Sequence, residues 1–289
     1  MSDRISLVEC PRDAFQGLPR FIPTETKADY LLSLIEAGFT RIDFGSFVSP
    51  KAVPQMQDTR QVLETIRPHL GSAELIAVVP NLKGIEAAID ASSIHCAGYV
   101  LSVSETFQQR NFHQTQEQAW TVVDQLVERA QAGSLELAIY LSMAFGNPYG
   151  DPWSVEKVRS YVERLAAKSI RQISLADTVG MAKPEQVCEL YSACRPALPA
   201  TVELGVHLHA RPDRWQEVVM AAHSVGCRRF DSALLGIGGC PFAEDHLVGN
   251  IPTEGLVGQF SRMGLVLDVT EESIQKPLAK AGEILRKYG

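Results

Sequence analysis

The sequence lacks the features that mark a membrane protein, a disulfide-stabilised secreted domain or a nucleic-acid-binding protein. No apolar run approaches the roughly 20 residues that span a bilayer, and residues 1–4 lead into a strand-like run without an apolar signal core. The six cysteines form no CxxC pair, a pattern typical of reduced thiols in the cytosol. The net charge of −7 provides no basic excess for a broad nucleic-acid surface, although a local basic cluster could bind a small anion. We therefore expect a cytoplasmic protein with no membrane and no nucleic-acid partner.

No linker rich in proline, glycine or serine divides the chain, and it contains no low-complexity segment. A length of 289 residues suits one α/β barrel, which usually has about 250 residues. We therefore expect residues 1–289 to form one catalytic domain, with two closing helices within residues 251–289.

Short apolar runs alternate with longer amphipathic runs. The strands that we expect cover residues 5–10, 41–44, 74–79, 98–102, 135–141, 172–175, 202–207 and 229–232. The helices that we expect cover residues 24–37, 58–70, 81–91, 115–132, 154–168, 184–194 and 213–225. Their ends carry helix signals, such as Thr24 at a cap position, Pro184 in a first turn, and Gly38 and Gly226 just after a helix.

Eight strands that alternate with helices require a mostly parallel sheet, because each helix carries the chain back to the same edge. Eight is also the number of such units that closes a (β/α)8 TIM barrel. The alternative is an open doubly wound sheet, which usually has five or six strands. No glycine-rich phosphate turn follows the first strand, so we favour an α/β TIM barrel with extra C-terminal helices.

Catalytic residues of such barrels lie where strands end and the following loops begin. Polar residues stand at several of the expected strand ends: Arg12 and Asp13, Asp43 and Ser46, Ser142, Asp177 and Thr178, His207 and His209, and the loop at residues 236–250. Residues two apart on a strand face the same side, so His207 and His209 should project together into the barrel mouth. Such imidazole pairs are common divalent-metal ligands, but the two rings could equally bond to neighbouring backbone.

The other strand-end residues each allow a second interpretation. Arg12-Asp13 places a permanent cation beside a hard oxygen ligand, yet this dipeptide is usually a loop salt bridge. Cys240 lies on a glycine-rich loop, where it is either a reactive thiol or an incidental small residue. Asn250 has an amide oxygen that suits a metal but is more often a turn residue. Asp177-Thr178 could hold a substrate hydroxyl or cap the next helix.

Seven segments, taken together, resemble the hydroxymethylglutaryl-CoA lyase family. They occur in the order of that family and cover residues 10–16 (Cys-Pro-Arg-Asp-Ala-Phe-Gln), 46–51, 53–56, 80–84, 173–180, 206–209 and 236–242. The resemblance extends over roughly residues 5–265. It implies a metal-dependent, pyruvate-carboxyltransferase-like TIM barrel that cleaves a 3-hydroxyacyl-CoA by retro-Claisen chemistry, giving acetyl-CoA and a 3-oxoacid.

The resemblance also implies a role for each candidate residue. A divalent cation, Mg²⁺ or Mn²⁺, would be held by Asp13, His207, His209 and Asn250. Arg12 would stabilise the departing enolate. Cys240 would return a proton to it, and Asp177 or His207 would take the hydroxyl proton. The substrate contacts that we expect are Gln16, Asp43, Ser46, Ser142 and Thr178, with Lys51 and Lys83 as candidate contacts for CoA.

The chain departs from the family pattern near this expected site. Ala14 replaces a glycine, Asp43 replaces a glutamate, and Ala210 replaces the aspartate that usually follows His-x-His. A lysine-bearing loop becomes Gly-Leu-Pro at residues 17–19, and the span from Cys240 to Asn250 is one residue longer. These changes leave the expected ligands in place but alter the residues around them, so they bear on the choice of substrate more than on the reaction.

Several functions are therefore compatible with the sequence. The first is cleavage of 3-hydroxy-3-methylglutaryl-CoA, and the second is the same chemistry on another 3-hydroxyacyl-CoA. A condensing enzyme of the isopropylmalate synthase type is disfavoured, because those chains carry a further C-terminal domain. A barrel that binds acyl-CoA without turnover is the alternative from another class. The resemblance also indicates a homodimer.

Overall fold

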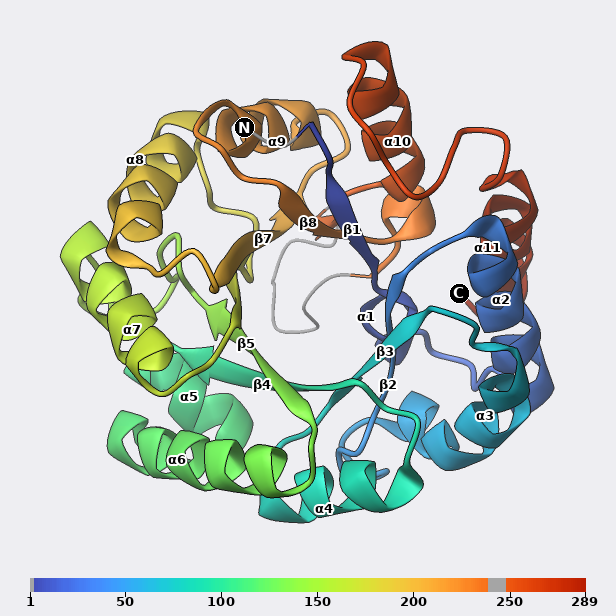
Figure 1. Ribbon diagram of the computed structural model, residues 1–289, viewed down its shortest axis with the longest axis horizontal. Coiled ribbons are helices and arrows are strands. Elements are labelled where there is room, and N and C mark those ends of the chain that lie inside the picture. The colour runs from blue at the N-terminus through green and yellow to red at the C-terminus, as the bar shows by residue number, and fades with distance from the viewer. Residues whose placement is uncertain (1–2, 239–247) are drawn as a thin grey trace.

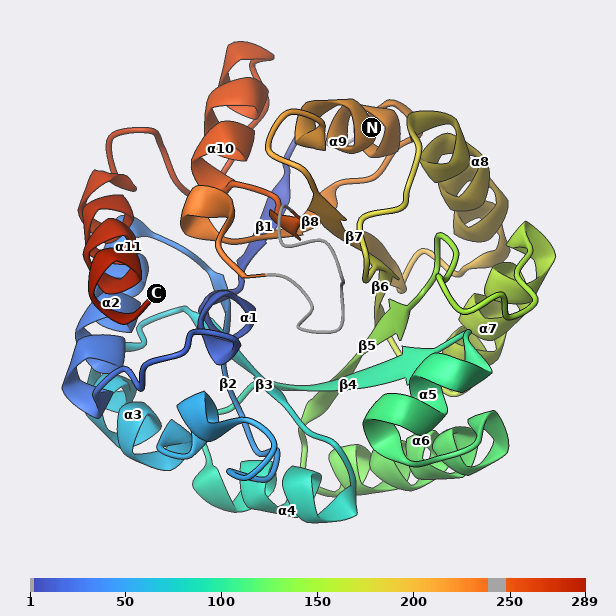
Figure 2. The same ribbon diagram turned by 180° about the vertical axis from the view of Figure 1, so that it is seen from behind.

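Eight parallel strands form a closed barrel in the computed structural model, which describes residues 3–238 and 248–289 (Figures 1 and 2). The barrel strands are β1 (Ser6–Glu9), β2 (Arg41–Ser46), β3 (Glu74–Val78), β4 (Cys96–Ser102), β5 (Glu136–Ser142), β6 (Gln172–Asp177), β7 (Glu203–Ala210) and β8 (Arg229–Ser232). Strands that follow one another in the chain pair in parallel, and the pairing of β1 with β8 closes the ring. This confirms the expected barrel and rules out the open sheet.

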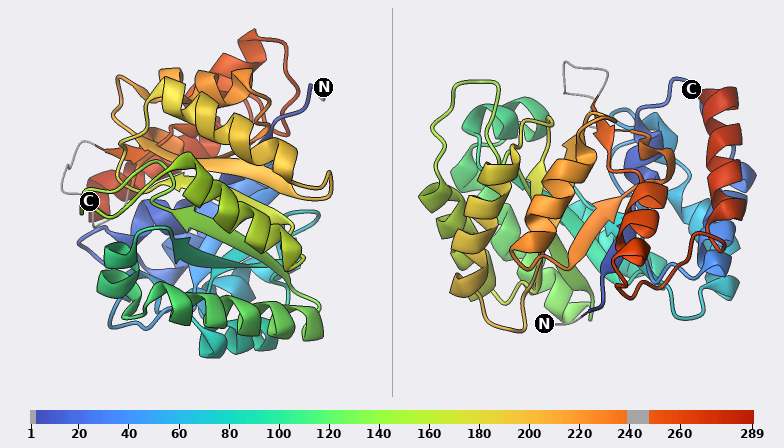
Figure 3. Two further views of the ribbon diagram at one scale, coloured as in Figure 1. Left: turned by 90° about the vertical axis from the view of Figure 1, so that its left-hand side faces the viewer. Right: turned by 90° about the horizontal axis from the view of Figure 1, so that it is seen from above.

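Helices surround the barrel, except for the short α1, which lies at the barrel mouth, and α11 packs beside α2 (Figures 1 and 3). They are α1 (Pro11–Gln16), α2 (Thr24–Ala37), α3 (Thr59–Ile66), α4 (Leu82–Ala91), α5 (Glu105–Phe112), α6 (Gln116–Ala132), α7 (Val155–Ala167), α8 (Pro184–Cys194), α9 (Trp215–Ser224), α10 (Thr253–Arg262) and α11 (Gln275–Tyr288). The helices α10 and α11 confirm the two expected C-terminal helices. Ion pairs from Lys280 to Asp29 and from Lys276 to Glu36 join α11 to α2. No helix of the described residues is long and apolar enough to cross a membrane.

Side-chain caps form at the starts of four described α-helices: α4, α5, α6 and α7. Thr115 and Gln118 form a reciprocal capping box at the start of α6, and Asn81 caps α4 through the amide of Gly84. The cap predicted at Thr24 is wrong: Pro23 occupies the cap position, and the Thr24 hydroxyl donates to Asp58 instead.

Three further differences from the expected elements have local causes. The helix predicted at 58–70 ends at Ile66 and continues as a 3-10 turn at Arg67–His69, since Pro68 cannot donate an α-helical hydrogen bond. Helix α9 begins at Trp215 rather than at residue 213. The short helices α1 and α5 were not expected, because six to eight residues carry too little periodicity to be recognised.

Of the five described cysteines, all are free thiols. Four of them, Cys10, Cys96, Cys194 and Cys227, are buried, and burial raises the pKa of each thiol. Cys188 is half-buried and packs against the hydrophobic core. The buried four act as small apolar side chains rather than as nucleophiles.

Candidate active site

The predicted metal ligands converge at the carboxyl end of the barrel. Asp13 lies in α1, directly after β1, and His207 and His209 lie on β7. Their candidate ligand atoms all lie within 4.8 Å of one another, and all three residues are buried. The two imidazole rings meet edge to face with centroids 5.0 Å apart, which confirms that the period of two on β7 turns both toward one space.

Asn250 joins this cluster through a two-residue strand, β9 (Gly249–Asn250), which pairs antiparallel with the end of β7. This pairing sets Asn250 opposite His209. The Asn250 amide nitrogen donates to Asp13 Oδ2 at 2.7 Å and to the Ile237 carbonyl at 2.9 Å. Both amide hydrogens are thereby used, and the amide oxygen has no partner among the described residues, so it can accept a hydrogen bond or bind a cation.

The free atoms of the cluster fit a divalent cation. Asn250 Oδ1 and His209 Nε2 are buried and accept or donate no hydrogen bond within the described structure. Leaving a buried polar atom without a partner costs about 1–3 kcal/mol, so two such atoms in one buried cluster indicate a missing partner. The distance of 3.6 Å from His209 Nε2 to Asp13 Oδ2 is too long for a hydrogen bond but suits two ligands of one ion. Oxygen and imidazole donors of this kind accept several hard or borderline ions.

His209 is fixed in the orientation that metal binding needs. Its Nδ1 lies 3.1 Å from the Thr178 carbonyl oxygen, so Nδ1 carries the proton and Nε2 keeps its lone pair. Burial alone would lower the pKa of His209, but the Asp13 carboxylate outweighs it and raises this pKa. Burial alone would raise the pKa of Asp13, but Arg12 and His209 outweigh this effect and hold the pKa well below its usual range. Asp13 is therefore an ionised ligand near neutral pH.

Arg12 is held rigidly beside the cluster. Its Nε and Nη2 donate to Asp43 Oδ2 at 3.0 and 2.6 Å, and its Nη1 donates to Asp13 Oδ1 at 3.0 Å. Gln16 connects the same pair, because it accepts from Arg12 at 3.3 Å and donates to Asp13 at 2.8 Å. Burial raises the pKa of Asp43, and the Arg12 guanidinium opposes that rise. Although the Asp43 side chain is shorter than the glutamate of the family pattern, both of its oxygens contact Arg12.

Asp177, Thr178 and Ser142 form a second group that adjoins the first through the Thr178 carbonyl. The two Asp177 oxygens accept the backbone N–H groups of Met181 and Ala182 at 2.9 and 2.8 Å. Burial raises the pKa of Asp177. The Thr178 hydroxyl donates to Ser142 Oγ at 3.1 Å and accepts the amide of Met143. Asp177 thus stabilises the loop before α8, whose cap position is Lys183, while lying beside the cluster.

Ser46 does not belong to either group. Its hydroxyl donates to the Val78 carbonyl and accepts the Val48 amide, which fixes the loop after β2. It lines a rim cavity of about 360 Å³ together with Arg60, Lys83 and the start of α4, whereas Lys51 is not among the lining residues.

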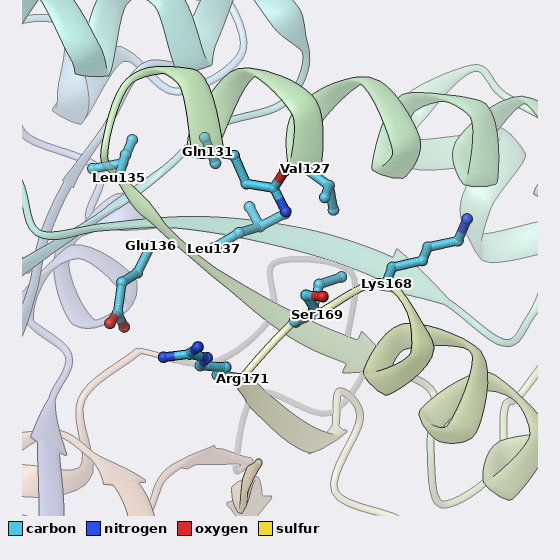
Figure 4. A pocket seen from close by; sticks show the side chains of 10 residues that line it. Val127, Gln131, Leu135, Glu136, Leu137, Lys168, Ser169 and Arg171 are labelled. Atoms are coloured by element: carbon cyan, nitrogen blue, oxygen red, sulfur yellow. The ribbon is translucent and has the colours of Figure 1, made fainter. Parts of the chain in front are cut away.

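A second cavity, of about 220 Å³, lies at the opposite end of the barrel (Figure 4). It is lined by residues at the starts of β5 and β6, including Glu136 and Arg171. It is therefore separate from the cluster, which sits at the carboxyl ends of the strands.

The glycine-rich segment before the cluster packs closely on α1. A Cβ on Gly238, which has φ +87°, would lie 2.6 Å from Ala14 Cα and 2.7 Å from the Asp13 carbonyl oxygen. Only glycine allows this approach without displacement of the ligand helix. Cys240, the predicted acid, lies outside the described residues, so its role stays a prediction.

Sequence reasoning missed several polar residues inside the barrel. Asp231 and Arg229 lie on β8 with their side chains almost fully buried, and Ser174 on β6 donates to Asp231 at 3.1 Å. Tyr140 on β5 packs edge-on against His207, with ring centroids 5.6 Å apart. The sequence signal that could have identified Arg229 and Asp231 is their spacing, because two charged residues two apart in a short strand lie on the same face of the sheet.

Comparison with known proteins extends over nearly the whole chain. The family model described as HMGL-like matches residues 5–277. The (R)-citramalyl-CoA lyase of Chloroflexus aurantiacus is 34% identical over 273 residues, which cover 91% of this chain and 85% of that protein. The hydroxymethylglutaryl-CoA lyase of Bacillus subtilis is 32% identical over 279 residues, which cover 96% of this chain and 91% of that protein.

Solved structures that are similar to this chain over nearly its whole length include two HMG-CoA lyases. An HMG-CoA lyase from Acinetobacter baumannii, in complex with coenzyme A and 3-methylmalate, superposes with a TM-score of 0.90 at 35% identity. This match covers 98% of this chain and 92% of that one. The HMG-CoA lyase of Bacillus subtilis superposes with a TM-score of 0.92 at 31% identity, over 100% of this chain and 96% of that one.

Proposed function

The chain belongs to the HMGL-like family, and from that premise we propose that it is a divalent-metal-dependent carbon–carbon lyase. The substrate that we propose is 3-hydroxy-3-methylglutaryl-CoA, cleaved to acetyl-CoA and acetoacetate. The observation that carries this proposal is the buried cluster of Asp13, His207 and His209 with the unpartnered amide oxygen of Asn250, all at the catalytic end of a barrel.

The residues that would hold Mg²⁺ or Mn²⁺ are these four, which combine carboxylate, amide and imidazole donors. When bound, such an ion supplies Lewis acidity and a fixed point of attachment for substrate oxygens. The chain's own contribution is orientation: Asn250 and Gln16 both donate to Asp13, and the Thr178 carbonyl sets the tautomer of His209.

The reaction needs one proton removed and one returned. Asp177 or His207 would accept the proton of the 3-hydroxyl, and the raised pKa of Asp177 suits this task. The electron pair released by the hydroxyl forms the new carbonyl, and the C2–C3 bond breaks to give the enolate of acetyl-CoA. Arg12 would stabilise this enolate, because its permanent charge is already fixed by Asp43 and Asp13. Cys240 is proposed to protonate the enolate, on the strength of the sequence resemblance alone.

A second candidate substrate is (R)-citramalyl-CoA, which differs from 3-hydroxy-3-methylglutaryl-CoA by one methylene in the carboxylate arm. Breaking the same bond in it would give acetyl-CoA and pyruvate. Two observations favour it: the 34% identity to the Chloroflexus enzyme, and the Acinetobacter complex with 3-methylmalate, an isomer of citramalate. One methylene changes discrimination by about 1–3 kcal/mol, so Asp43 and Ala14 could shift the preference.

The CoA moiety would lie over the carboxyl end of the barrel. The rim cavity beside Ser46 brings Lys83 and Arg60 together near the start of α4, which gives positive charge for phosphate groups. We further propose a homodimer located in the cytoplasm.

The direct test is turnover of both thioesters by the purified protein with Mg²⁺ or Mn²⁺. Acetoacetate from the first substrate supports the main proposal, and pyruvate from the second supports the alternative. A chelator-treated sample is the control. If neither thioester is cleaved above that control, the lyase proposal fails.

A further inference from the structure

Asp231 lies inside the barrel, directly beside His207, because the two residues are partners in the pairing of β7 with β8. Asp231 Oδ2 is 3.3 Å from His207 Nδ1, and this buried nitrogen makes no hydrogen bond to any other described group. The exposed fraction of Asp231 is 1%. A carboxylate in this position lies against Nδ1, so Nε2 is the ring nitrogen that remains to bind a cation together with Asp13 and His209.

The carboxylate is kept charged and in place by groups around it. Ser174 donates to Oδ2 at 3.1 Å, and Arg229 Nη2 lies 3.5 Å from Oδ1. Both oxygens therefore face a donor or a cation, and the carboxylate is placed as an acceptor toward the imidazole.

The placement of Arg229 is built into the barrel rather than incidental. Its side chain is 1% exposed, and a Cβ on Gly205 would lie 2.9 Å from its Cγ, so β7 accommodates it only because residue 205 is glycine. None of its three guanidinium nitrogens has a hydrogen-bond partner in the described structure. Its charge is balanced instead by Asp231 and, at 3.8 Å, by Glu203.

We propose that Asp231 is a positioning residue of the metal site: it holds the Nδ1–H tautomer of His207 and thereby directs Nε2 toward the ion, with Arg229 as its counter-charge. The inference rests on the proposed function, because it needs the divalent cation. A carboxylate behind a ligating histidine raises the basicity of that ligand, and loss of such a partner weakens metal affinity about 10–100-fold.

The purely structural alternative is that Asp231 only neutralises Arg229. Asp231→Asn separates the two. An asparagine amide can donate to Nδ1 and so reverse the tautomer, placing a proton on Nε2, where it blocks metal binding. Glu203→Gln is the matched control, because it removes the other carboxylate near Arg229 and leaves the contact with His207 intact.

The experiment measures Mn²⁺ affinity by titration calorimetry for the wild type, Asp231→Asn and Glu203→Gln. We expect Asp231→Asn to bind about 10–100-fold more weakly and Glu203→Gln to bind as the wild type does. Equal affinity of all three proteins would overturn the inference while leaving the metal site intact. A wild type that binds no Mn²⁺ would overturn the proposed function and this inference together.

A second measurement does not depend on whether the variant folds. Nitrogen NMR of the metal-free wild type, labelled at histidine and assigned with His207→Gln, reports which ring nitrogen of His207 carries the proton. The Nδ1–H form is expected. The Nε2–H form would refute the positioning role of Asp231.

Discussion

Replacing Arg12 with lysine tests the part of the site that the geometry defines most closely. Arginine uses Nε and Nη2 together on Asp43, at 3.0 and 2.6 Å, while Nη1 reaches Asp13 at 3.0 Å. A lysine ammonium keeps the charge but is a single point, so it cannot maintain contacts in both directions. The positive charge would then no longer be held in a fixed position toward the enolate.

The size of the effect follows from what is lost. Removing one preorganised donor from a developing oxyanion lowers kcat about 10²–10³-fold, or about 2.7–4 kcal/mol of barrier. We therefore expect Arg12→Lys to lose kcat by this factor, with Mn²⁺ affinity within about 3-fold of wild type, since the positive charge beside Asp13 remains. Steady-state kinetics and calorimetry measure the two quantities.

The control is Arg159→Lys, because Arg159 lies on the outer surface of α7, and its ion pair among the described residues is with Glu163 on the same helix. It should retain full turnover. A kcat for Arg12→Lys within about 3-fold of wild type would refute the view that the fixed fork of Arg12, rather than its charge, stabilises the enolate.

Three further predictions follow from individual contacts. Asp13→Ala should lose bound metal on dialysis, as measured by mass spectrometry of the metal content, and full retention would argue against its place in the ligand set. Gly238→Ala should lower kcat by more than about 10-fold, because its Cβ would displace the backbone at Asp13 and Ala14. Its control is Gly146→Ala, which has an equally left-handed φ of +119° but no atom within 4 Å of the added Cβ; equal activity of the two variants would contradict the steric argument. Burial raises the pKa of Glu9 from 4.5 to about 8, so the folded state keeps a proton that the unfolded chain releases. The free energy of unfolding should then decrease between pH 5 and 8, by at most about 1.4 kcal/mol per pH unit. Urea denaturation of Glu9→Gln should lack this decrease, and parallel pH profiles of the two proteins would disprove it.

The barrel and much of the site could be predicted from the sequence because the relevant signals are local. Apolar runs of strand length fix the eight strands, and the period of two on β7 brings His207 and His209 to one side. The position directly after β1 likewise places Arg12 and Asp13 at the barrel mouth, as the strand-end rule of such barrels requires.

Other features depend on contacts between distant parts of the chain. The hydrogen bond from Asn250 to Asp13 joins residues 237 positions apart and depends on the two-residue strand β9. Arg229 and Asp231 look like strand residues of an exposed face until the sheet closes and turns that face inward. The packing of Gly238 on α1 is likewise a tertiary contact, which the glycine alone permits but does not identify.

The measurement that tests the central claim most directly is a crystal structure of the wild type grown with Mn²⁺, with the ion located by its anomalous scattering. The account predicts one ion at about 2.0–2.3 Å from an Asp13 oxygen, a ring nitrogen of each of His207 and His209, and the Asn250 amide oxygen. An ion bound elsewhere, or no anomalous peak among these four side chains at saturating Mn²⁺, would contradict it.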